Sequence, residues 1–310
     1  MLLDAPPIQG RRTLYPRPEA RPHPMQLLPA IGVIVAALSA AGLAPAADTV
    51  SKPQRIVSMN LCTDELVLRL ADRRNISSVT WQSRDRDNSN VADLARDVPI
   101  NHGVAEEILP LNPDLVLAGI YTARAPVALL KRAGMRIVDT DVPRSFEDVR
   151  QQYREIAALL DERERGEQII AEMDSNLAKL ERDRPPVAPT AIVFHGDHYT
   201  YGRGSMIDVV MTRAGLENVA VRLGIGEVGQ VPLEIIAMNS VDVLIVGSHR
   251  DGPALATELL RHPVLSRLSD RTRVVVIPNR LWNCGGPALV EAVERLMRVA
   301  KEVRGKVPNE

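Results

Sequence analysis

Short runs of β-branched residues alternate with amphipathic segments twice along this chain of 310 residues, and a long stretch without strands separates the two series. The predicted strands of the first series begin near residues 55, 77, 114 and 136, and those of the second begin near residues 190, 242 and 273. Strands that alternate with helices in this way are typical of parallel sheets covered by helices. The sequence therefore predicts an α/β fold.

The two series predict two lobes. We expect an N-terminal α/β lobe over residues 53–143 and a C-terminal α/β lobe over residues 187–307, with a helical connector over residues 144–184 between them. Hydrophobic residues make up 45% of the chain, which is enough to build a core in each lobe. The lengths of the two predicted lobes are ordinary for single domains.

The connector is expected to contain two helices. Ser145 with Asp148 three residues later has the spacing of a capping box, which predicts a helix that continues to about residue 160. Asp161 with Glu164 has the same spacing and predicts a second helix that reaches about Arg182. At about 1.5 Å per residue the second helix would span roughly 30 Å, which is the width of a small domain.

The N-terminal region is typical of an export signal. Residues 30–44 are small and apolar, too few for a comfortable membrane span, and an Ala-Pro-Ala cleavage pattern ends at residue 46. We therefore predict a cleavable signal peptide over residues 1–47 and a periplasmic location. An uncleaved anchor is the alternative, and Met25 is a second candidate for the start of translation.

Charge and cysteine content exclude several classes of protein. Lys and Arg number 38 against 39 Asp and Glu, so no basic excess favours a nucleic acid as partner. The two cysteines, Cys62 and Cys284, are too few and too far apart for a disulfide-dense scaffold or a four-thiolate zinc site. Each is expected at the start of a helix, one in each lobe. We favour two partly buried thiols, with a disulfide between the lobes as the alternative.

One signature occurs in both predicted lobes. Glu106 precedes Asp114 by eight residues, and Glu234 precedes Asp242 by eight residues; in each lobe the Asp opens a strand that ends in glycine. An acidic residue at a helix start is favourable on electrostatic grounds alone, which is the simpler explanation of each Glu. The equal placement in both lobes favours a pseudo-symmetric architecture.

The chain resembles the periplasmic substrate-binding proteins of ABC importers for ferric siderophores, heme and cobalamin. The resemblance covers about residues 53–303 and rests on four segments in the right order: RIVSMNLCTDELVLRLADRRNISSVT, GVAEEILPLNPDLVLAG, GRGSMIDVVMTRAGLENVA and VPLEIIAMNSVDVLIV. It implies two Rossmann-like lobes joined by a single long backbone helix, with a ligand cleft between the lobes. It also implies that the protein is not an enzyme, that it has no cofactor, and that it carries a metal chelate, either a ferric siderophore or cobalamin.

The resemblance implies the partners as well. Members of the family dock on the permease through one acidic residue in each lobe, which pairs with arginines of the membrane protein. The matching positions are Glu106 and Glu234, and the neighbouring Glu107 could substitute in the first lobe. The expected partners are an ABC permease with its ATPase at the inner membrane, and we expect the binding protein to be a monomer.

Ligand residues are expected in the loops that follow the strands, because ligands of open α/β sheets bind beyond the carboxyl ends of the strands. Aromatic residues are only 3% of the chain, yet most of them fall in those loops, where they would supply broad apolar contact. Arginines in the same loops would suit an anionic chelate. The expected ligand residues are Trp81, Arg84, Tyr121, Arg124, Tyr199, Tyr201, Arg203, Arg250 and Trp282. Aromatic rings that close the core and solvated arginines are the simpler alternatives.

Several other functions remain as alternatives. Convergence of His102, His195, His198 and His249 would make a site for bare zinc or manganese, and Tyr199, Tyr201 or His198 could bind the iron of heme. Glycines near residue 224 match a dinucleotide fingerprint, but no apolar strand precedes them. An exported α/β hydrolase is the least favoured alternative, because the chain lacks a nucleophile-elbow motif.

Overall fold

Two parallel sheets form the framework of the protein. The structure, a computed structural model, describes residues 51–195, 198–239, 241–248 and 271–304. The first sheet has the strand order β3-β2-β1-β4-β5, and all its pairs are parallel. Its strands are β1 (Ile56–Ser58), β2 (Ile76–Thr80), β3 (Ile100–Asn101), β4 (Leu115–Gly119) and β5 (Ile137–Thr140).

The second sheet has the strand order β11-β10-β6-β8 and is also parallel. Strands β7 and β9 form a separate antiparallel pair, and both come from the same part of the chain as the second sheet. The strands are β6 (Thr190–Phe194), β7 (Tyr199–Tyr201), β8 (Glu217–Asn218), β9 (Val228–Gln230), β10 (Val243–Ser248) and β11 (Arg273–Pro278).

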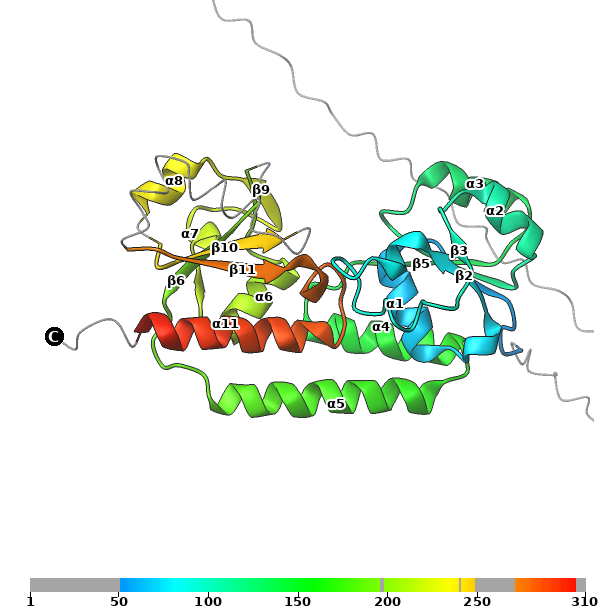
Figure 1. The fold of residues 1–310 in the computed structure, drawn as a ribbon, viewed down its shortest axis with the longest axis horizontal. Helices are drawn as coiled ribbons and strands as arrows, with labels where there is room; N and C mark the ends of the chain where they lie inside the picture. Colours follow the sequence, from blue (N-terminus) through cyan, green and yellow to red (C-terminus); the bar gives the residue numbers. More distant parts are fainter. Residues whose placement is uncertain (1–50, 196–197, 240, 249–270, 305–310) are drawn as a thin grey trace, which may run out of the picture. The chain divides into compact units, whose positions relative to one another are not determined.

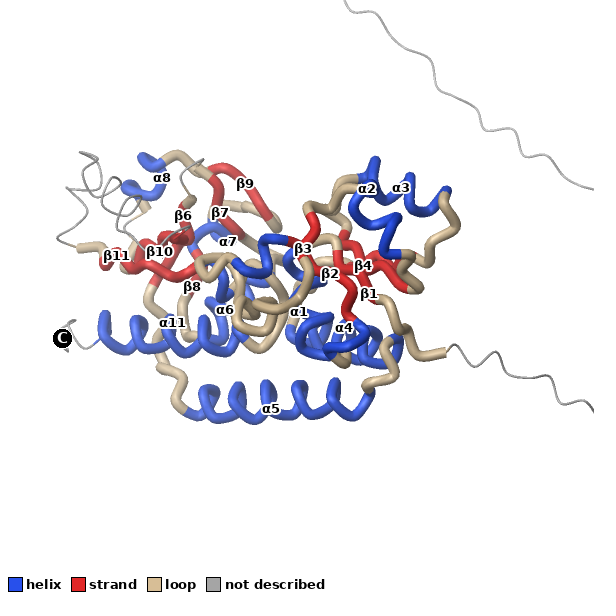
Figure 2. Tube along the Cα trace, turned by 45° about the vertical axis from the view of Figure 1, so that its right-hand side comes forward, coloured by secondary structure: helices blue, strands red, loops and turns tan. Residues whose placement is uncertain are grey.

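Helices cover both sheets, as Figures 1 and 2 show. We call the first sheet with its helices the first lobe, and the second sheet with its helices the second lobe. The helices are α1 (Leu61–Leu70), α2 (Ala105–Ile108), α3 (Arg124–Arg132), α4 (Phe146–Leu159), α5 (Arg163–Arg182), α6 (Met206–Arg213), α7 (Val219–Arg222), α8 (Leu233–Met238) and α11 (Ala288–Arg304). Short 3-10 turns precede or follow several strands, among them η2 (Trp81–Arg84) and η4 (Asn279–Leu281).

The two sheets share one topology. The order β2-β1-β4-β5 in the first sheet corresponds to β8-β6-β10-β11 in the second. In each set of four, the strand that comes first in the chain lies between the second strand and the last two. Asp114 accepts the backbone N–H groups of Gln54 and Arg55 at the start of β1, each at 2.9 Å. Asp242 accepts the backbone N–H and the hydroxyl of Thr190 at the start of β6, each at 2.7 Å. The repeated Asp thus has the same structural role in both sheets.

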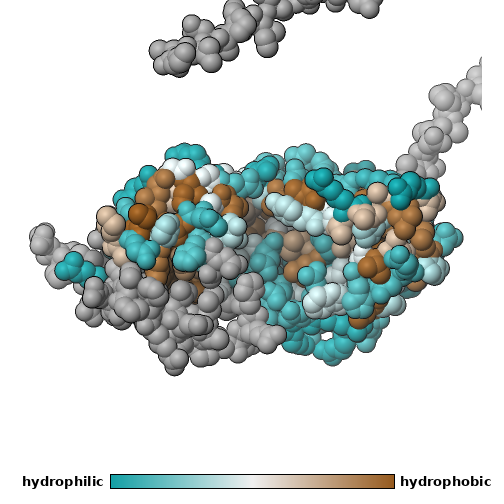
Figure 3. Space-filling view, turned by 90° about the horizontal axis from the view of Figure 1, so that it is seen from above, coloured by the Kyte–Doolittle hydropathy of each residue, from teal (hydrophilic) through white to brown (hydrophobic). Residues whose placement is uncertain are grey.

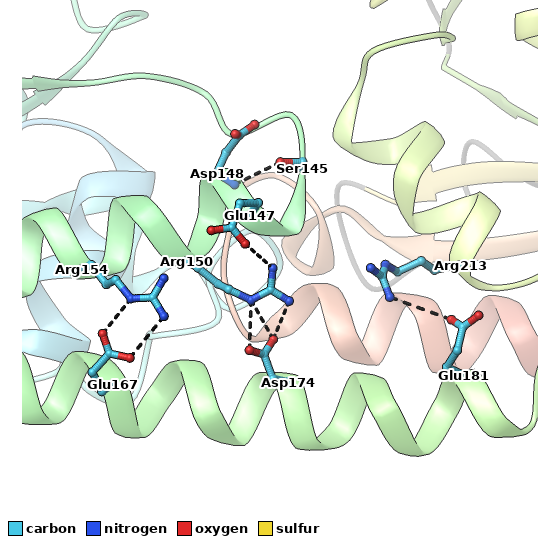
Figure 4. Close-up of polar contacts among 9 residues, drawn as sticks. All are labelled: Ser145, Glu147, Asp148, Arg150, Arg154, Glu167, Asp174, Glu181 and Arg213. Atoms are coloured by element: carbon cyan, nitrogen blue, oxygen red, sulfur yellow. Dashed lines mark hydrogen bonds and ion pairs between the residues drawn. The ribbon is translucent and has the colours of Figure 1, made fainter.

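The backbone helix is α5, and it contacts both lobes. Arg150 of α4 donates to the Asp174 carboxylate, with a shortest distance of 2.7 Å. Toward the other end of α5, Glu181 forms an ion pair with Arg213 of α6 at 3.9 Å. Figure 4 shows these contacts along the helix, and Figure 1 shows α5 beneath both sheets. The 20 residues of α5 match the predicted helix.

Of the two predicted starts of the connector helices, one agrees with the structure and one does not. Ser145 caps α4 as predicted, because its hydroxyl accepts the N–H of Asp148 at 3.0 Å. Asp161 does not cap α5: its backbone is in the left-handed region, with φ of 56°, and the N-cap position is Glu162. The capping box at Asp161 was therefore a wrong prediction, since the tight turn between α4 and α5 takes that residue.

Several predictions lie outside what the structure tests. The predicted signal peptide of residues 1–47, His249 and Arg250 all lie outside the described residues. The predicted domain boundaries also remain predictions. Among the helices of the described residues, none is long and apolar enough to cross a membrane.

Candidate functional site

A cavity of about 300 Å³ opens at the carboxyl ends of the strands of the first sheet, and both lobes line it. The first lobe contributes Asn60, Leu61, Cys62, Gln82, Gly119, Ile120, Tyr121, Thr140, Asp141, Val142, Pro143 and, from α4, Gln152. The second lobe contributes Met206, Trp282, Asn283, Cys284 and Gly285. A larger groove of about 1030 Å³ lies along α5 and α11, away from the strand ends.

The position of the cavity follows from the topology of the sheet. In the first sheet β1 lies between β2 and β4, so the chain turns to opposite sides of β1 and leaves a crevice beyond the carboxyl ends of β1 and β4. The loop after β1 supplies Asn60, and the loop after β4 supplies Tyr121. The sequence-based expectation that ligand residues follow strands therefore leads to the same place.

Asn60 joins the two loops that form the base of the cavity. Its Oδ1 accepts the N–H groups of Cys62 and Thr63, each at 2.9 Å, and thereby caps α1. Its Nδ2 donates to the Thr122 hydroxyl at 2.9 Å. The close approach needs glycine at position 119, because a Cβ there would lie 2.3 Å from Asn60 Nδ2.

The apolar wall combines aromatic rings with a disulfide. Trp282 is buried, with 7% of its surface exposed, whereas Tyr121 is 83% exposed at the opening. Cys62 and Cys284 are joined by a disulfide with a Cα–Cα distance of 5.1 Å. The favoured prediction of two free thiols was therefore wrong, since the fold brings residues 222 positions apart to bonding distance.

Amides make up most of the polar side chains in the lining. Asn60, Gln82, Gln152 and Asn283 line the cavity, and the single charged residue among the described lining is Asp141. Gln152 donates to the backbone carbonyl of Asp141 at 2.9 Å, which ties α4 to the loop after β5. A site with this lining offers hydrogen-bond donors and acceptors to a ligand without offering a cation.

The predicted arginines have other positions. Arg84 donates to the backbone carbonyls of Ala95 and Val98, at 3.2 and 2.7 Å, and so holds the loop that follows η2. Arg124 begins α3 and Arg203 precedes α6, and both are exposed. None of these three lines the cavity. The prediction of an arginine-lined site therefore gains no support from the described residues.

Among the predicted aromatic residues, Tyr121 and Trp282 are brought together at the cavity and the others are not. Trp81 is 49% exposed at the start of η2. Tyr199 and Tyr201 form β7, and the ring of Tyr201 lies edge-on to His195 with 5.4 Å between centroids. Burial raises the pKa of Tyr201 above its ordinary value.

The histidines do not converge in the described part of the chain. His102 hydrogen-bonds to Glu107 through its backbone N–H at 2.6 Å and its Nδ1 at 3.0 Å. The His198 ring contacts the Phe194 ring edge-on at 5.7 Å. The described residues contain no group of three His, Cys, Asp or Glu side chains that could hold a metal ion.

The two predicted docking residues occupy equivalent positions in the two lobes. Glu106 is the second residue of α2 and Glu234 is the second residue of α8, each after a buried first residue, and both are exposed. Among the described residues, no hydrogen bond or ion pair engages either carboxylate. The Glu107 carboxylate is held by His102, whose hydrogen bonds keep the pKa of Glu107 below its usual value.

The sequence-based selection missed Asn60, Asp141, Gln152 and Asn283. Asn60 directly follows a predicted strand, and Asp141 directly follows β5, which ends earlier than the predicted run. The rule that selected Tyr121 could therefore have found Asn60, and also Asp141 once the end of β5 is known. Gln152 is on a connector helix and no local signal marks it, because only the packing of α4 beside the loop after β5 brings it to the cavity.

A profile of the periplasmic binding protein family matches residues 56–280, which include both sheets. The chain belongs to the periplasmic binding protein family. As a member of it, the chain is a substrate-binding protein of the kind that serves ABC importers.

Family relatives with reported ligands are similar along most of this chain. A cobalamin-binding protein of Halobacterium salinarum is 24% identical over 255 residues, which are 79% of this chain and 69% of the relative. The heme-binding protein of Roseiflexus sp. RS-1 has a TM-score of 0.68 at 24% identity and covers 81% of this chain and 98% of its own. The vitamin B12 binding protein of Vibrio cholerae has a TM-score of 0.64 at 17% identity and covers 82% and 99%.

These structural similarities establish the fold of this family member. The molybdate-binding protein of Haemophilus influenzae also shares it, with a TM-score of 0.65 at 18% identity over 82% of this chain and 87% of its own. One fold therefore serves ligands as different as heme, vitamin B12 and molybdate in the neighbouring structures. The choice of ligand has to be argued from the cavity.

Proposed function

We propose that this protein captures a metal chelate in the cavity between its lobes and delivers it to an ABC permease. The observation that carries the proposal is the joint lining: Trp282 and Asn283 come from the second lobe, and Asn60 and Tyr121 come from the first. A ligand that fills the cavity contacts both lobes at once. Binding therefore joins the two surfaces that a permease would recognise.

We further propose that the chelate is cobalamin. A corrinoid has a broad, largely apolar ring edged with amide side chains and carries little net charge. The lining of the cavity matches these features, because it combines a buried indole with the four amide side chains. The cobalamin-binding relative from Halobacterium salinarum supports this assignment.

Ferric siderophores are less well matched by the described lining. Catecholate and carboxylate complexes of iron carry negative charge, which is recognised by arginine or lysine. The described residues that line the cavity include no arginine and no lysine, and the one charged side chain, that of Asp141, is acidic. An anionic chelate would meet repulsion from Asp141, and the described lining offers no compensating cation.

Heme is the second candidate, and the observation in its favour is Tyr121. This phenol lines the cavity and is 83% exposed, so it is accessible to a heme iron. The two carboxylates of heme would also need donors, and the amides Gln82 and Asn283 are the available ones in the described lining.

We propose that Glu106 and Glu234 orient the loaded protein on the permease. Both carboxylates are exposed at equivalent helix starts. Exposed apolar side chains lie close to them along the chain: Val104 is 38% exposed beside α2, and Met238 is 78% exposed at the end of α8. Figure 3 shows hydrophobic patches bordered by hydrophilic residues on the face seen from above. A carboxylate flanked by apolar surface is suited to a protein partner.

We propose that the protein acts as a monomer in the periplasm after removal of residues 1–47. Family membership supports the location. The disulfide is consistent with it, because disulfides persist in oxidising compartments such as the periplasm.

Isothermal titration calorimetry tests the proposed ligand. The exported protein is titrated separately with cyanocobalamin, hemin, a ferric tricatecholate, molybdate and zinc. We expect one-to-one binding of cyanocobalamin with a Kd below about 1 μM. Binding of hemin alone would replace cobalamin by heme, and binding of zinc alone, or of none of these, would contradict the chelate proposal.

A matched pair of variants checks the location of the ligand. Tyr121→Ala removes an aromatic contact at the opening and should weaken binding by about tenfold. Val187→Ala is the control, because Val187 is an exposed apolar residue, 58% accessible, that does not line the cavity. Equal affinities of both variants would place the ligand elsewhere.

A further inference from the structure

The disulfide between Cys62 and Cys284 is part of the cavity itself. Cys62 is the second residue of α1 in the first lobe, and Cys284 lies in the segment between η4 and α11 in the second lobe. Both residues line the cavity. The bond is therefore a covalent tie between the two lobes at the position where the ligand is proposed to bind.

The segment that carries Cys284 packs closely against the first lobe. A Cβ at Gly285 would lie 2.2 Å from Pro143 Cγ. A Cβ at Gly286 would lie 3.0 Å from the Tyr153 hydroxyl and 3.1 Å from Glu65 Oε1. Gly285 permits an approach that a Cβ would prevent, and a Cβ at Gly286 would require its neighbours to move by a few tenths of an ångström. The segment therefore has little freedom to move toward the first lobe.

Noncovalent ties between the lobes flank the disulfide. Arg280 of η4 donates to Asn90 Oδ1 at 3.0 Å, and the Asn90 amide donates to the Arg280 carbonyl. Arg144 donates to Glu227 Oε2 at 3.1 Å, with both side chains about half exposed. The Arg144–Glu227 pair is solvent-exposed, and exposed ion pairs contribute little to stability. The disulfide is the covalent restraint on movement of the second lobe away from the first at this position, and it adds to the buried core that the two lobes share.

We propose that the Cys62–Cys284 disulfide is a positioning device that sets the width of the cavity. It holds Trp282 and Asn283 at a fixed spacing from Asn60 and Tyr121, so the ligand enters a site that is already formed. A preformed site loses less conformational freedom on binding than an open one. This inference deepens the proposed function, since the same cavity is the proposed ligand site.

The alternative is that the disulfide only stabilises the fold. Closing a long loop restricts the unfolded chain, and any covalent link between the two residues would do so. A role in setting the cavity width depends on the length of the bridge, because only the direct disulfide would hold the two walls at their present spacing. Replacing the disulfide by a longer bridge therefore separates the two roles.

The experiment compares three forms of the exported protein, all with Trp81→Phe so that Trp282 is the remaining tryptophan. The first form is oxidised. The second is reduced and its two thiols are treated with dichloroacetone, in which each thiolate forms a C–S bond and displaces one chloride, leaving a bridge longer by three carbon atoms. The third is Cys62→Ser with Cys284→Ser, which has no bridge.

Three quantities are measured for each form: the melting temperature, the bimolecular constant for acrylamide quenching of Trp282, and the Kd for cyanocobalamin. The quenching constant is taken from lifetimes, because a disulfide itself quenches a nearby indole. In the long-bridged form we expect a melting temperature within about 3 °C of the oxidised form. We expect its quenching constant to rise about twofold or more and its Kd to rise about fivefold or more.

A quenching constant for the long-bridged form equal to that of the oxidised form would overturn the positioning role. This readout needs no ligand, so it decides the inference even if the oxidised protein binds no cobalamin, a result that would count against the proposed function instead. If the serine variant fails to fold, the comparison between the two bridged forms still gives the answer. A lower melting temperature of the long-bridged form without a change in its quenching constant would show that the disulfide only stabilises the fold.

Discussion

The carboxylate of Asp64 is buried in the first lobe, where Thr80 donates to it twice: from the backbone N–H to Oδ1 at 3.0 Å, and from the hydroxyl to Oδ2 at 2.5 Å. Asp64 belongs to α1, and Thr80 ends β2 just before the turn that bears Gln82 of the cavity. Burial raises the pKa of Asp64 to about 7, although the bonds from Ser58 and Thr80 act in the opposite direction.

Asp64 should make stability depend on pH. Because the folded protein holds the proton up to about pH 7 and the unfolded chain releases it near 3.8, the contribution of Asp64 is greatest below pH 3.8 and is lost as the pH rises through about 7. The full loss is about 4 kcal/mol, at 1.36 kcal/mol per pKa unit. Asp64→Asn removes the titration, so its stability relative to the wild type should increase from about pH 4 to about pH 8.

Urea unfolding at the two pH values measures this relative stability. Asp93→Asn is the control for a general effect of removing a carboxylate, because Asp93 is exposed and pairs with Arg86 and Arg96. A relative stability of Asp64→Asn that does not change with pH would show that Asp64 has an ordinary pKa in the folded protein.

Trp282 should supply a large share of the ligand affinity. It is the buried aromatic residue of the cavity, and Trp282→Ala removes its contact area. We expect the Kd for cyanocobalamin to rise about thirtyfold, which corresponds to about 2 kcal/mol. Calorimetric titration measures it, and Trp282→Phe should recover part of the affinity. A Kd within about twofold of the wild type for the alanine variant would remove the indole from the site.

Asn60 should affect both folding and binding, whereas an equivalent cap elsewhere should affect folding alone. Asn60→Ala removes the cap of α1 and the bond to Thr122, so it should lower the free energy of unfolding by about 1 kcal/mol or more. Ser145→Ala removes the cap of α4 at a similar cost. Of these two residues, Asn60 lines the cavity and Ser145 does not, so the Asn60 variant alone should bind cobalamin more weakly. Urea unfolding and calorimetry together check the pair, and equal affinities would contradict the role of Asn60 in the site.

Reversal of charge at the docking positions should block uptake without weakening ligand binding. Glu106→Arg and Glu234→Arg place a cation where the permease is expected to present arginines, so uptake of labelled ligand should fall about tenfold or more in each case. Glu172→Arg on α5 is the control, because it is an exposed residue on a helix that Figure 1 shows on the opposite side of the molecule from α2 and α8. Undiminished uptake by both docking variants would remove this assignment.

Much of the framework could be predicted from local patterns. The four main strands of the first sheet and three of the second coincide with predicted β-branched runs, and α5 coincides with the predicted second helix of the connector. The short elements β3, β7, β8 and β9 were not predicted. Strands of two or three residues bury too little apolar surface to produce a periodic pattern, so their formation depends on neighbouring strands.

The candidate site was only partly predictable. Tyr121 and Trp282 follow strands and do line the cavity, but Arg84 follows a strand in the same way and bonds to the carbonyls of its own lobe. A position after a strand fixes the edge of the sheet at which a side chain lies. It does not fix the direction in which the side chain points, which depends on the packing of the loops.

The sequence by itself determined the α/β class, the repeated placement of Glu and Asp in two lobes, and the long helix between them, because these follow from periodicity and spacing along the chain. Only the tertiary structure decided that Cys62 and Cys284 form a bond, that Gln152 reaches the cavity, and that the described lining of the cavity has no arginine. Contacts between residues so far apart in the chain arise from how the two lobes pack against the backbone helix, and no local pattern records that packing.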